Sequence, residues 1–212
     1  MKSILIANPK GGSGKTTLAV NIAGHLAAAG WPVRLLDLDR QQSASNWLAL
    51  RAGELPPIQL FSDKSASHKG AGAEAAGDGW LVIDSQAGLH GKNLERALKL
   101  VDRVVVPIAP SLFDMNASRA FLEVLQAEKA VRKGRIFVGV VGMRMAPRTR
   151  AAGALEKFMA QQEMPILAYL REAQIYVNAA FEGKSLFDLP PHLAEREQEQ
   201  WAYLLAWLHA VG

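Results

Sequence analysis

The sequence predicts one α/β domain: a doubly wound, mostly parallel sheet with helices on both faces. Two observations predict it. Short apolar runs alternate with helical segments along the 212 residues, and polar motifs follow three of those runs. Ligands of such sheets collect at the carboxyl ends of the strands. Because no internal repeat or clear boundary interrupts the alternation, we expect residues 1–212 to form a single domain with its binding site at those motifs.

The first part of the chain alternates in this way up to a polar stretch. Strands are expected at 3–8, 32–39, 58–61 and 80–84. Each is an apolar run, and two of the four end in carboxylates. Helices are expected at 16–29 and 43–53. The first stops at Gly30, and the second starts at a serine that can cap it. Residues 62–79 are small and polar without a clear period and predict a loop or a weak helix.

The rest of the chain continues the alternation. Helices are expected at 91–102, 116–132, 149–162, 176–181 and 194–210. Strands are expected at 103–110, 135–143 and 165–170. Short β-rich runs separated by helical segments are typical of parallel strands joined by crossover helices.

Composition excludes several classes of protein. The chain has no cysteine, which excludes a disulfide framework, thiolate metal sites and iron–sulfur ligation. The five histidines show no metal-ligand spacing. No apolar run approaches the roughly eighteen residues that cross a bilayer, and no signal-peptide pattern precedes the first strand. We therefore expect a soluble, cytoplasmic protein.

A phosphate-binding loop follows the first strand, in "ANPKGGSGKTTLA". Its glycines let backbone N–H groups turn toward an anion, and the next helix points its positive end at the phosphates. The motif assigns Lys15 to the β- and γ-phosphates and the Thr16 hydroxyl to Mg²⁺. The nucleotide-binding residues predicted here are Gly11, Gly12, Ser13, Gly14, Lys15 and Thr16. Lys10 occupies the first slot of the motif, where the general pattern has glycine.

Three aspartates end strands near this loop. Asp84 ends "WLVID", the place from which a P-loop protein normally supplies an aspartate to the water shell of Mg²⁺. Asp37 and Asp39 end the strand at 32–39, and side chains two residues apart on a strand share a face. We expect both to point toward the same cavity. The alternative for each aspartate is a helix N-cap or a loop carboxylate.

Together these motifs resemble a known family. "KGGSGKTT", "DLDRQQSASNW", "VIDSQAG" and "PIAPSLFD" occur in the order found in the ParA/MinD family of positioning ATPases. The chain looks most similar to the small plasmid-partition ParA-type proteins without an N-terminal DNA-binding extension. The resemblance covers nearly the whole chain and implies an ATPase that uses ATP and Mg²⁺ and forms a homodimer when ATP is bound.

The resemblance also implies roles for single residues. Lys10 would reach across a nucleotide-sandwich dimer to the phosphates of the other subunit; the alternative is a solvated lysine near a polyanion. Asp39 would position the hydrolytic water, so Lys10, Lys15 and Asp39 are the expected catalytic residues. Asp37 and Asp84 would hold the water shell of the metal. The other residues that would contact the nucleotide or relay its state are Asn8, Thr17, Pro110, Ser111 and Asp114.

Three positions depart from the family pattern. Arg40 stands where the family usually has proline, and Ser85-Gln86 where it usually has Thr-Pro. Both lie near the switch that senses hydrolysis, so they bear on turnover and coupling more than on ATP binding. The asparagine that usually reads adenine after the strand "RIFVGVVGM" is replaced, and Met143 or Arg144 takes its place in the expected base site.

Charge indicates the surface on which the protein acts. The formal net charge is only +4, but residues 92–150 hold twelve lysines and arginines against five acidic residues. Such a patch suits phosphate-backbone contacts that carry no sequence information, and dimerisation would double it. The predicted DNA contacts are Arg144, Arg148, Arg150, Arg171 and Lys184. The alternative is a solvated basic face without a ligand.

The expected function is therefore a dimerising ATPase that binds nonspecific DNA in its ATP state and associates with the nucleoid. An adaptor of the ParB or centromere-binding type would stimulate it to segregate plasmid or chromosomal DNA or other large cargo. A small-molecule ATP-dependent ligase of the same fold is one alternative. A MinD-like membrane-associated ATPase is another, with "EQEQWAYLLAWLHAVG" at 197–212 as its apolar face. That segment has no lysine or arginine, which favours packing in the core and makes membrane binding the weaker interpretation.

Overall fold

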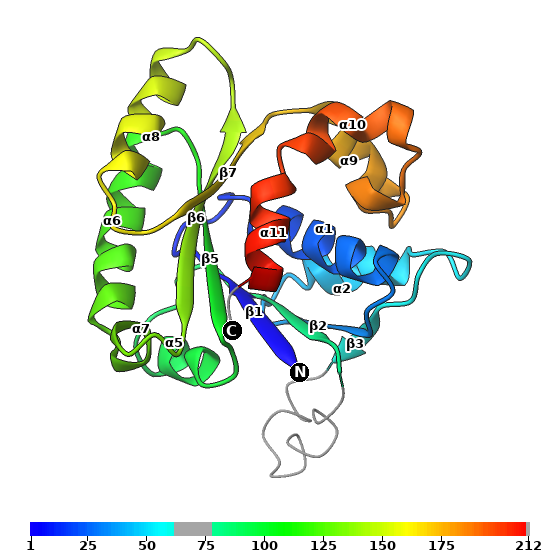
Figure 1. Ribbon diagram of the computed structural model, residues 1–212, viewed down its shortest axis with the longest axis horizontal. Coiled ribbons are helices and arrows are strands. Elements are labelled where there is room, and N and C mark those ends of the chain that lie inside the picture. The colour runs from blue at the N-terminus through cyan, green and yellow to red at the C-terminus, as the bar shows by residue number, and fades with distance from the viewer. Residues whose placement is uncertain (62–77, 211–212) are drawn as a thin grey trace.

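Seven parallel strands form one sheet in the order β3-β2-β4-β1-β5-β6-β7 (Figure 1). The structure is a computed structural model that describes residues 1–61 and 78–210. From β1 at the centre the chain winds to one edge, returns beside β1 as β4, and then winds to the other edge. This is the predicted doubly wound α/β fold, which is confirmed. The loop or weak helix expected at 62–79 lies mostly outside the described residues.

All seven predicted strands are present. They are β1 Lys2–Ile6, β2 Val33–Asp37, β3 Gln59–Phe61, β4 Trp80–Asp84, β5 Arg103–Ile108, β6 Phe137–Met145 and β7 Ile166–Arg171. Every residue of β4 and β5 is buried, because helices cover both faces of the sheet. The register pairs both Ile6 and Asp37 with Asp84, so β1, β2 and β4 end level with one another. Polar residues at these three ends therefore meet at one edge.

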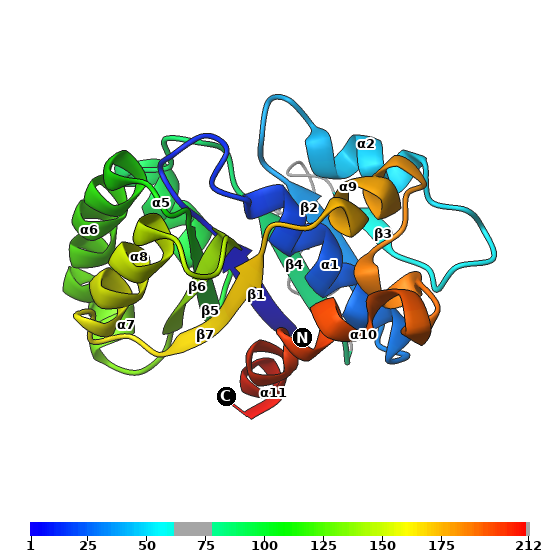
Figure 2. The ribbon, with the colours of Figure 1, turned by 90° about the horizontal axis from the view of Figure 1, so that it is seen from above.

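The helices connect these strands or follow the last one. They are α1 Lys15–Ala28, α2 Ser43–Ala49, α5 Gly91–Leu98, α6 Leu112–Ala127, α7 Lys129–Arg132, α8 Arg150–Ala160, α9 Gln174–Phe181, α10 Pro191–Glu199 and α11 Ala202–Ala210, with a 3₁₀ helix η1 at Leu186–Asp188. Seen from above, α5, α6 and α8 lie on one side of the sheet, and α1, α2, α9 and α10 lie on the other (Figure 2). Each face thus has its own hydrophobic core.

Two helical regions differ from the prediction. The helix expected at 116–132 begins earlier, because the Ser111 side chain caps α6 by accepting a hydrogen bond from the Asp114 N–H at 3.1 Å. It is also broken at Glu128, whose extended backbone (φ −62°, ψ 130°) separates α6 from α7. The single helix expected at 194–210 is two helices, and α10 already starts at Pro191, a residue type favoured at the first helical position.

The final helix lies against the core. Its apolar face was the basis of the membrane alternative, and four of the six side chains in that face are buried: Trp201, Leu204, Trp207 and Leu208. Leu205 also packs against the same core, and Val211 lies outside the described residues. The expected core packing of this segment is therefore confirmed for its described residues. Within residues 1–61 and 78–210, no helix is both long and apolar enough to cross a membrane.

Candidate functional site

The glycine-rich loop turns between β1 and α1 at the carboxyl edge of the sheet. Gly14 is the N-cap of α1 and has a left-handed backbone (φ 98°); a Cβ at this position would lie 2.7 Å from Met143 Cε. A side chain would strain the loop and strike β6, so this position requires glycine. The first turn of α1 carries no acidic residue that would neutralise its positive end. The loop therefore offers backbone N–H groups and a helix N-terminus to an anion.

A cavity of about 420 Å³ opens at this loop, within the usual size range of small-molecule sites. The predicted loop residues all line it: Gly11, Gly12, Ser13, Gly14, Lys15, Thr16 and Thr17. Asp39, Met143 and Arg144 line it as well. The structure thus brings together residues from β6, from the end of β2 and from the loop, although Gly12 and Arg144, for example, are 132 residues apart in sequence.

Lys15 is buried beside this cavity, with 6% of its surface exposed. Its Nζ donates a hydrogen bond to the Lys10 carbonyl at 2.8 Å. Burial lowers the pKa of Lys15, while the nearby carboxylates Asp84 and Asp39 favour its charged form. A buried ammonium whose direct partner is a neutral carbonyl can exchange that partner for phosphate oxygens, which bind it more strongly.

Asp84 is fully buried at the end of β4, next to the loop. Its Oδ2 accepts a hydrogen bond from the Thr16 hydroxyl at 2.7 Å, while its Oδ1 has no hydrogen-bond partner among the described residues. Burial raises the pKa of Asp84 to about 7; Thr16 and Lys15 oppose this rise, and Asp37 and Asp39 add to it. A buried oxygen without a partner is costly, and binding a cation would relieve the cost.

Asp37 and Asp39 have different surroundings. The Asp37 side chain accepts hydrogen bonds from the backbone N–H groups of Asp39 at 3.0 Å and Ser45 at 2.9 Å, which fixes the start of α2. Asp39 lines the cavity and accepts a hydrogen bond from the Gln41 N–H at 3.0 Å. The loop-carboxylate alternative therefore describes part of what Asp37 does in this structure, whereas Asp39 lies where a bound ligand would meet it.

These oxygen atoms fit Mg²⁺, which prefers hard oxygen ligands and keeps several waters. The Thr16 hydroxyl and the Asp84 carboxylate are adjacent, and Asp37 ends the neighbouring strand. In the described part of the chain, no three His, Cys, Asp or Glu side chains are grouped so as to hold a metal by themselves. A magnesium ion here would depend on phosphate oxygens and water for the rest of its shell.

Lys10 and Asn8 form the opposite end of the loop. Asn8 is fully buried, and its Nδ2 donates to the Pro107 carbonyl at 2.7 Å and to Ser118 Oγ at 2.9 Å. Its Oδ1 accepts from the Lys10 N–H at 2.8 Å. The main chain of Lys10 is thus held by Asn8 on one side and by Lys15 on the other, and its side chain is not part of the cavity lining.

Four residues predicted to contact the nucleotide or relay its state lie outside the lining of the cavity: Asn8, Pro110, Ser111 and Asp114. Asn8 instead anchors the loop to β5 and α6. Ser111 and Asp114 are hydrogen-bonded to each other at the start of α6. Their proposed part in relaying the state of the nucleotide remains a prediction.

The cavity lining also contains residues that sequence reasoning missed, among them Gln41, Ser43, Leu170, Glu172, Tyr176 and Val177. Four of the six come from β7, α9 and the turn between them. Arg144, which was predicted, also lines the cavity, beside the loop. It lies where the β6–β7 register shifts, has a left-handed backbone (φ 49°), and donates a hydrogen bond to the Gly12 carbonyl. Irregular strand geometry of this kind often redirects a side chain toward a site.

The five predicted DNA contacts fall into two groups. Arg144, Arg148 and Arg150 are exposed and lie at or after the end of β6, on the same edge of the sheet as the loop. Arg171 and Lys184 form ion pairs instead: Arg171 Nε donates to Glu197 at 2.6 Å, and Lys184 Nζ to Glu182 at 2.6 Å. These acidic partners offset the positive charge that Arg171 and Lys184 would otherwise offer to a phosphate.

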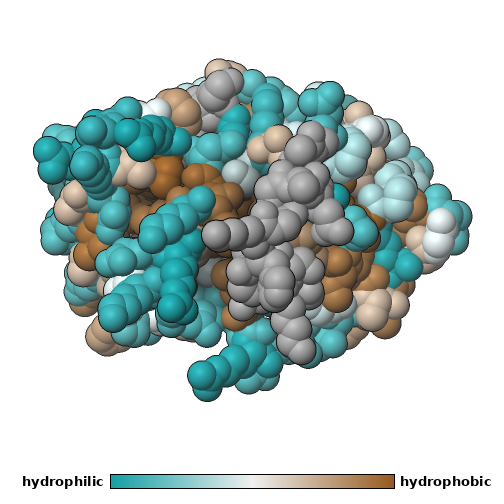
Figure 3. Space-filling view, turned by 90° about the horizontal axis from the view of Figure 1, so that it is seen from below, coloured by the Kyte–Doolittle hydropathy of each residue, from teal (hydrophilic) through white to brown (hydrophobic). Residues whose placement is uncertain are grey.

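A further group of exposed cations was not predicted as a DNA contact. Its members are Lys129, Arg132, Lys133 and Arg135, on α7 and in the turn that follows it. They precede β6 and so lie at the amino edge of the sheet, away from the cavity. Seen from below, hydrophilic side chains gather on the part of the surface that carries α5 and α7 (Figure 3).

Comparison with known proteins identifies this architecture. The model of the CobQ/CobB/MinD/ParA nucleotide binding domain matches residues 4–186. Protein ParA of Rhizobium radiobacter is 31% identical over 153 residues, which are 71% of this chain and 68% of that protein. The maintenance of carboxysome distribution protein A of Halothiobacillus neapolitanus is 26% identical over 191 residues, which are 88% of this chain and 87% of that one.

A solved structure shows the same fold. It is the ATP complex of an McdA variant from Cyanothece, with a TM-score of 0.70, 19% identity and 96% of each chain covered. Since the family model spans most of the chain, and the residues it matches include the loop, Asp84 and most of the cavity, this protein belongs to the CobQ/CobB/MinD/ParA family of nucleotide-binding domains.

Proposed function

We propose that this protein is a Mg²⁺-dependent ATPase that dimerises around ATP, binds nonspecific DNA as that dimer, and positions a plasmid, chromosome region or other large cargo. The observation that carries the ATPase part is the junction of Lys15, Thr16 and Asp84. A buried ammonium and a buried carboxylate with a free oxygen lie there beside an open helix N-terminus. This combination suits the phosphates and the metal of a nucleoside triphosphate.

The cavity residues divide the chemistry among them. Mg²⁺, when bound with the nucleotide, would neutralise charge on the β- and γ-phosphates. Thr16, Asp84 and Asp37 would hold the ion and its waters, and Lys15 would bind the phosphates directly. Asp39, a carboxylate that lines the cavity next to the loop residues, would accept a hydrogen bond from the attacking water and hold it in line with the γ-phosphate.

Lys10 supports the dimer. Its backbone is fixed from two sides by hydrogen bonds, and its side chain is not part of the lining of its own cavity. Two copies facing each other across ATP could each place this lysine on the phosphates of the other, as in an isologous dimer. The γ-phosphate would supply the additional negative charge that stabilises this exchange.

The DNA surface in this proposal consists of Arg144, Arg148 and Arg150. They are exposed and lie on the edge of the sheet that such a dimer would bring together, so ATP would place two copies of the patch on one assembly. Names of relatives point to similar roles: one is a ParA protein, and another maintains carboxysome distribution. An adaptor protein that binds the cargo would stimulate hydrolysis and thereby release the dimer from DNA.

Binding of a labelled random-sequence DNA duplex tests this proposal. The duplex is titrated with protein and ATP, ADP or no nucleotide, each at low and moderate salt. We expect binding only with ATP, and weaker binding at higher salt. Lys10→Ala should bind nucleotide as a monomer yet lose ATP-dependent dimerisation in light scattering, and with it DNA binding. If Lys10→Ala still formed dimers with ATP, the sandwich role of Lys10 would be contradicted. DNA binding that does not depend on the nucleotide would contradict the proposal that ATP controls DNA binding.

A further inference from the structure

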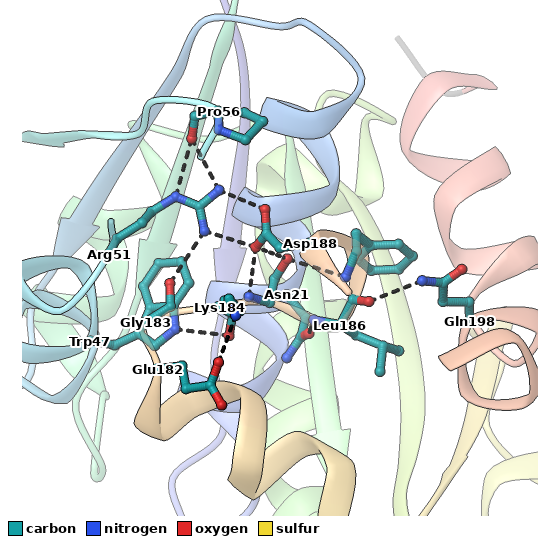
Figure 4. A network of polar contacts seen from close by, with 12 residues as sticks. Asn21, Trp47, Arg51, Pro56, Glu182, Gly183, Lys184, Leu186, Asp188 and Gln198 are labelled. Carbon is teal, nitrogen blue, oxygen red and sulfur yellow. Dashed lines mark hydrogen bonds and ion pairs between the residues drawn. The ribbon is translucent and has the colours of Figure 1, made fainter. Parts of the chain in front are cut away.

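A second buried charge centre lies outside the chemistry proposed above. The side chains of Arg51 and Asp188 are 4% and 0% exposed, and they form a two-pronged ion pair in which Arg51 Nη1 and Nη2 each donate to one Asp188 oxygen at 2.8 Å (Figure 4). The two residues are 137 positions apart in sequence. Burying such a pair is unfavourable unless its remaining hydrogen-bonding groups are also satisfied.

Those remaining groups have partners. Arg51 Nε and Nη2 donate to the Pro56 carbonyl at 3.1 and 3.0 Å, and Nη1 donates to the Gly183 carbonyl at 3.3 Å. Asp188 Oδ2 also accepts from the backbone N–H and the hydroxyl of Ser185, at 2.7 and 2.6 Å. The pair therefore has one well-defined geometry and fixes the segment from Gly183 to Asp188 against the end of α2.

Contacts from three other elements hold the same segment, as Figure 4 shows. Trp47 Nε1 of α2 donates to the Lys184 carbonyl at 3.2 Å. Asn21 of α1 accepts from the Leu186 N–H at 2.7 Å, and Gln198 of α10 donates to the Leu186 carbonyl at 2.9 Å.

Gly183 adds close packing to these contacts. It has a left-handed backbone, and a Cβ on it would lie 2.4 Å from the carbonyl carbon of Leu50. The chain thus passes α2 at a distance that only glycine allows.

The segment matters for the cavity because it follows α9 directly. Tyr176 and Val177 of α9 line the cavity, and Ala179 is the one residue of α9 that counts as buried. The helix is held at its start, where it follows β7, and at its end by the segment around Arg51. Between these points, the Trp201 Nε1–H donates a hydrogen bond to the Tyr176 hydroxyl at 3.0 Å. The ion pair is therefore one of the contacts that set the position of this wall, together with the packing of Ile175, Tyr176 and Ala180 against the core.

The phosphate side of the cavity has independent anchors. Ser45 of α2 is tied to Asp37 at 2.9 Å, and Trp47 is 5% exposed in the core. The loop itself is tied by Asn8 and by α1. Loss of the Arg51 side chain would therefore loosen α9 while leaving the loop and the Asp37 anchor in place.

We infer that Arg51 and Asp188 are positioning residues that set the wall formed by α9 against the phosphate loop, so that the cavity fits the nucleoside part of its ligand. The inference rests on the proposed function, because it takes the ligand to be a nucleoside triphosphate. Under this inference, Arg51 and Asp188 contribute to the affinity for the nucleoside, and neither of them contacts the phosphates.

Calorimetric titration of Arg51→Met with two ligands tests this inference. The ligands are ATP and inorganic tripolyphosphate, both with Mg²⁺, at a temperature where circular dichroism shows each protein to be folded. We expect the Kd for ATP to rise about tenfold, because a displaced wall no longer fits the nucleoside. The Kd for tripolyphosphate should change by less than about twofold, because the loop keeps its own anchors. Glu182→Gln, which breaks the exposed ion pair of the same region, is the matched control and should leave both values unchanged.

The outcomes are distinct. Equal weakening of both ligands would show a general loss of structure and overturn the inference, as would unchanged ATP affinity in folded Arg51→Met. A wild-type protein that binds tripolyphosphate and not ATP would overturn the proposed function and the inference with it. Arg51→Lys keeps the charge but loses the two-pronged geometry. It provides a second test if the methionine variant does not fold, with an expected rise of about threefold for ATP alone.

Discussion

Asp188 and Asp84 are both buried carboxylates, but their partners differ. Asp188 receives both arms of Arg51 and two hydrogen bonds from Ser185. Asp84 receives one hydrogen bond, from Thr16, and its Oδ1 has no partner in the described part of the chain. Burial alone would raise the pKa of both groups. At Asp188 the hydrogen bonds from Arg51 and Ser185 reverse the effect and lower the pKa, whereas at Asp84 burial prevails and the pKa is about 7.

This difference separates a structural centre from a binding site. A centre whose hydrogen bonds are complete holds the fold in one arrangement and gains nothing from a ligand. A centre with an unsatisfied oxygen and a buried ammonium makes the free protein less stable but leaves positions for a cation and phosphates. The chemistry is therefore expected to depend on Asp84 and its neighbours, and the stability of the fold and the position of the α9 wall on Asp188 and Arg51.

The largest effect is expected for Lys15→Ala. Removing the ammonium that is proposed to contact the phosphates should lower kcat/KM for ATP by about 10²–10³-fold, as for other preorganised charge contacts in enzymes. A phosphate-release assay with saturating Mg²⁺ measures it. Lys133→Ala removes an exposed lysine away from the cavity and is the matched control for charge: its turnover should stay at the wild-type level. Turnover within about threefold of wild type in Lys15→Ala would remove this lysine from the site.

Asp188→Asn should have the next largest effect, which is a loss of stability. The variant leaves the Arg51 charge buried without a carboxylate, so unfolding by urea should show a loss of about 3 kcal/mol. Glu182→Gln lies in the same region but breaks an exposed pair, and it should leave the urea midpoint nearly unchanged. A loss below about 1 kcal/mol for Asp188→Asn would mean that the centre is less tightly built than its hydrogen bonds indicate.

Asp84→Asn should have the smallest effect on stability, and it should stabilise the protein rather than destabilise it. In the folded, nucleotide-free protein Asp84 keeps its proton up to about pH 7, whereas the unfolded chain releases it near the ordinary value of 3.8. The unfolded state thus loses a proton that the folded state retains, so wild-type stability falls as pH rises through this window. Asparagine does not titrate, and we expect the variant to be about 1–2 kcal/mol more stable at pH 7.

Urea unfolding at pH 4.5, 5.5 and 7 checks this expectation. The difference between Asp84→Asn and wild type should grow with pH, because only the wild type carries the titrating group. A difference that stays constant from pH 4.5 to 7 would show that burial does not perturb this carboxylate. The same variant should also lose Mg²⁺-dependent hydrolysis, which a purely structural role for Asp84 would leave intact.

Local patterns in the sequence were sufficient for the phosphate side of the site. The loop residues are contiguous, and Asp84 and Asp37 end apolar runs, so the rule that strand ends meet at one edge of a parallel sheet places them correctly. The early start of α6 could also have been found, since Ser111 with Asp114 three residues later is a helix-capping pattern.

Other features have no local signal. Tyr176 and Val177 reach the cavity only because β7 and α9 return over the sheet to the loop. Arg171 looked like a free cation, but the fold places Glu197, 26 residues away, beside it. Lys184 differs, because its partner Glu182 is only two residues away and could have been considered from the sequence.

The sequence by itself determined the order of strands and helices, the phosphate loop and the carboxylates at the strand ends. Each of these depends on residues close together in the chain or on one rule about parallel sheets. Only the tertiary structure decided which charges are satisfied and which stay open. That outcome depends on contacts between residues far apart in sequence, such as the 137 positions between Arg51 and Asp188, and on the burial that makes each missing hydrogen bond costly.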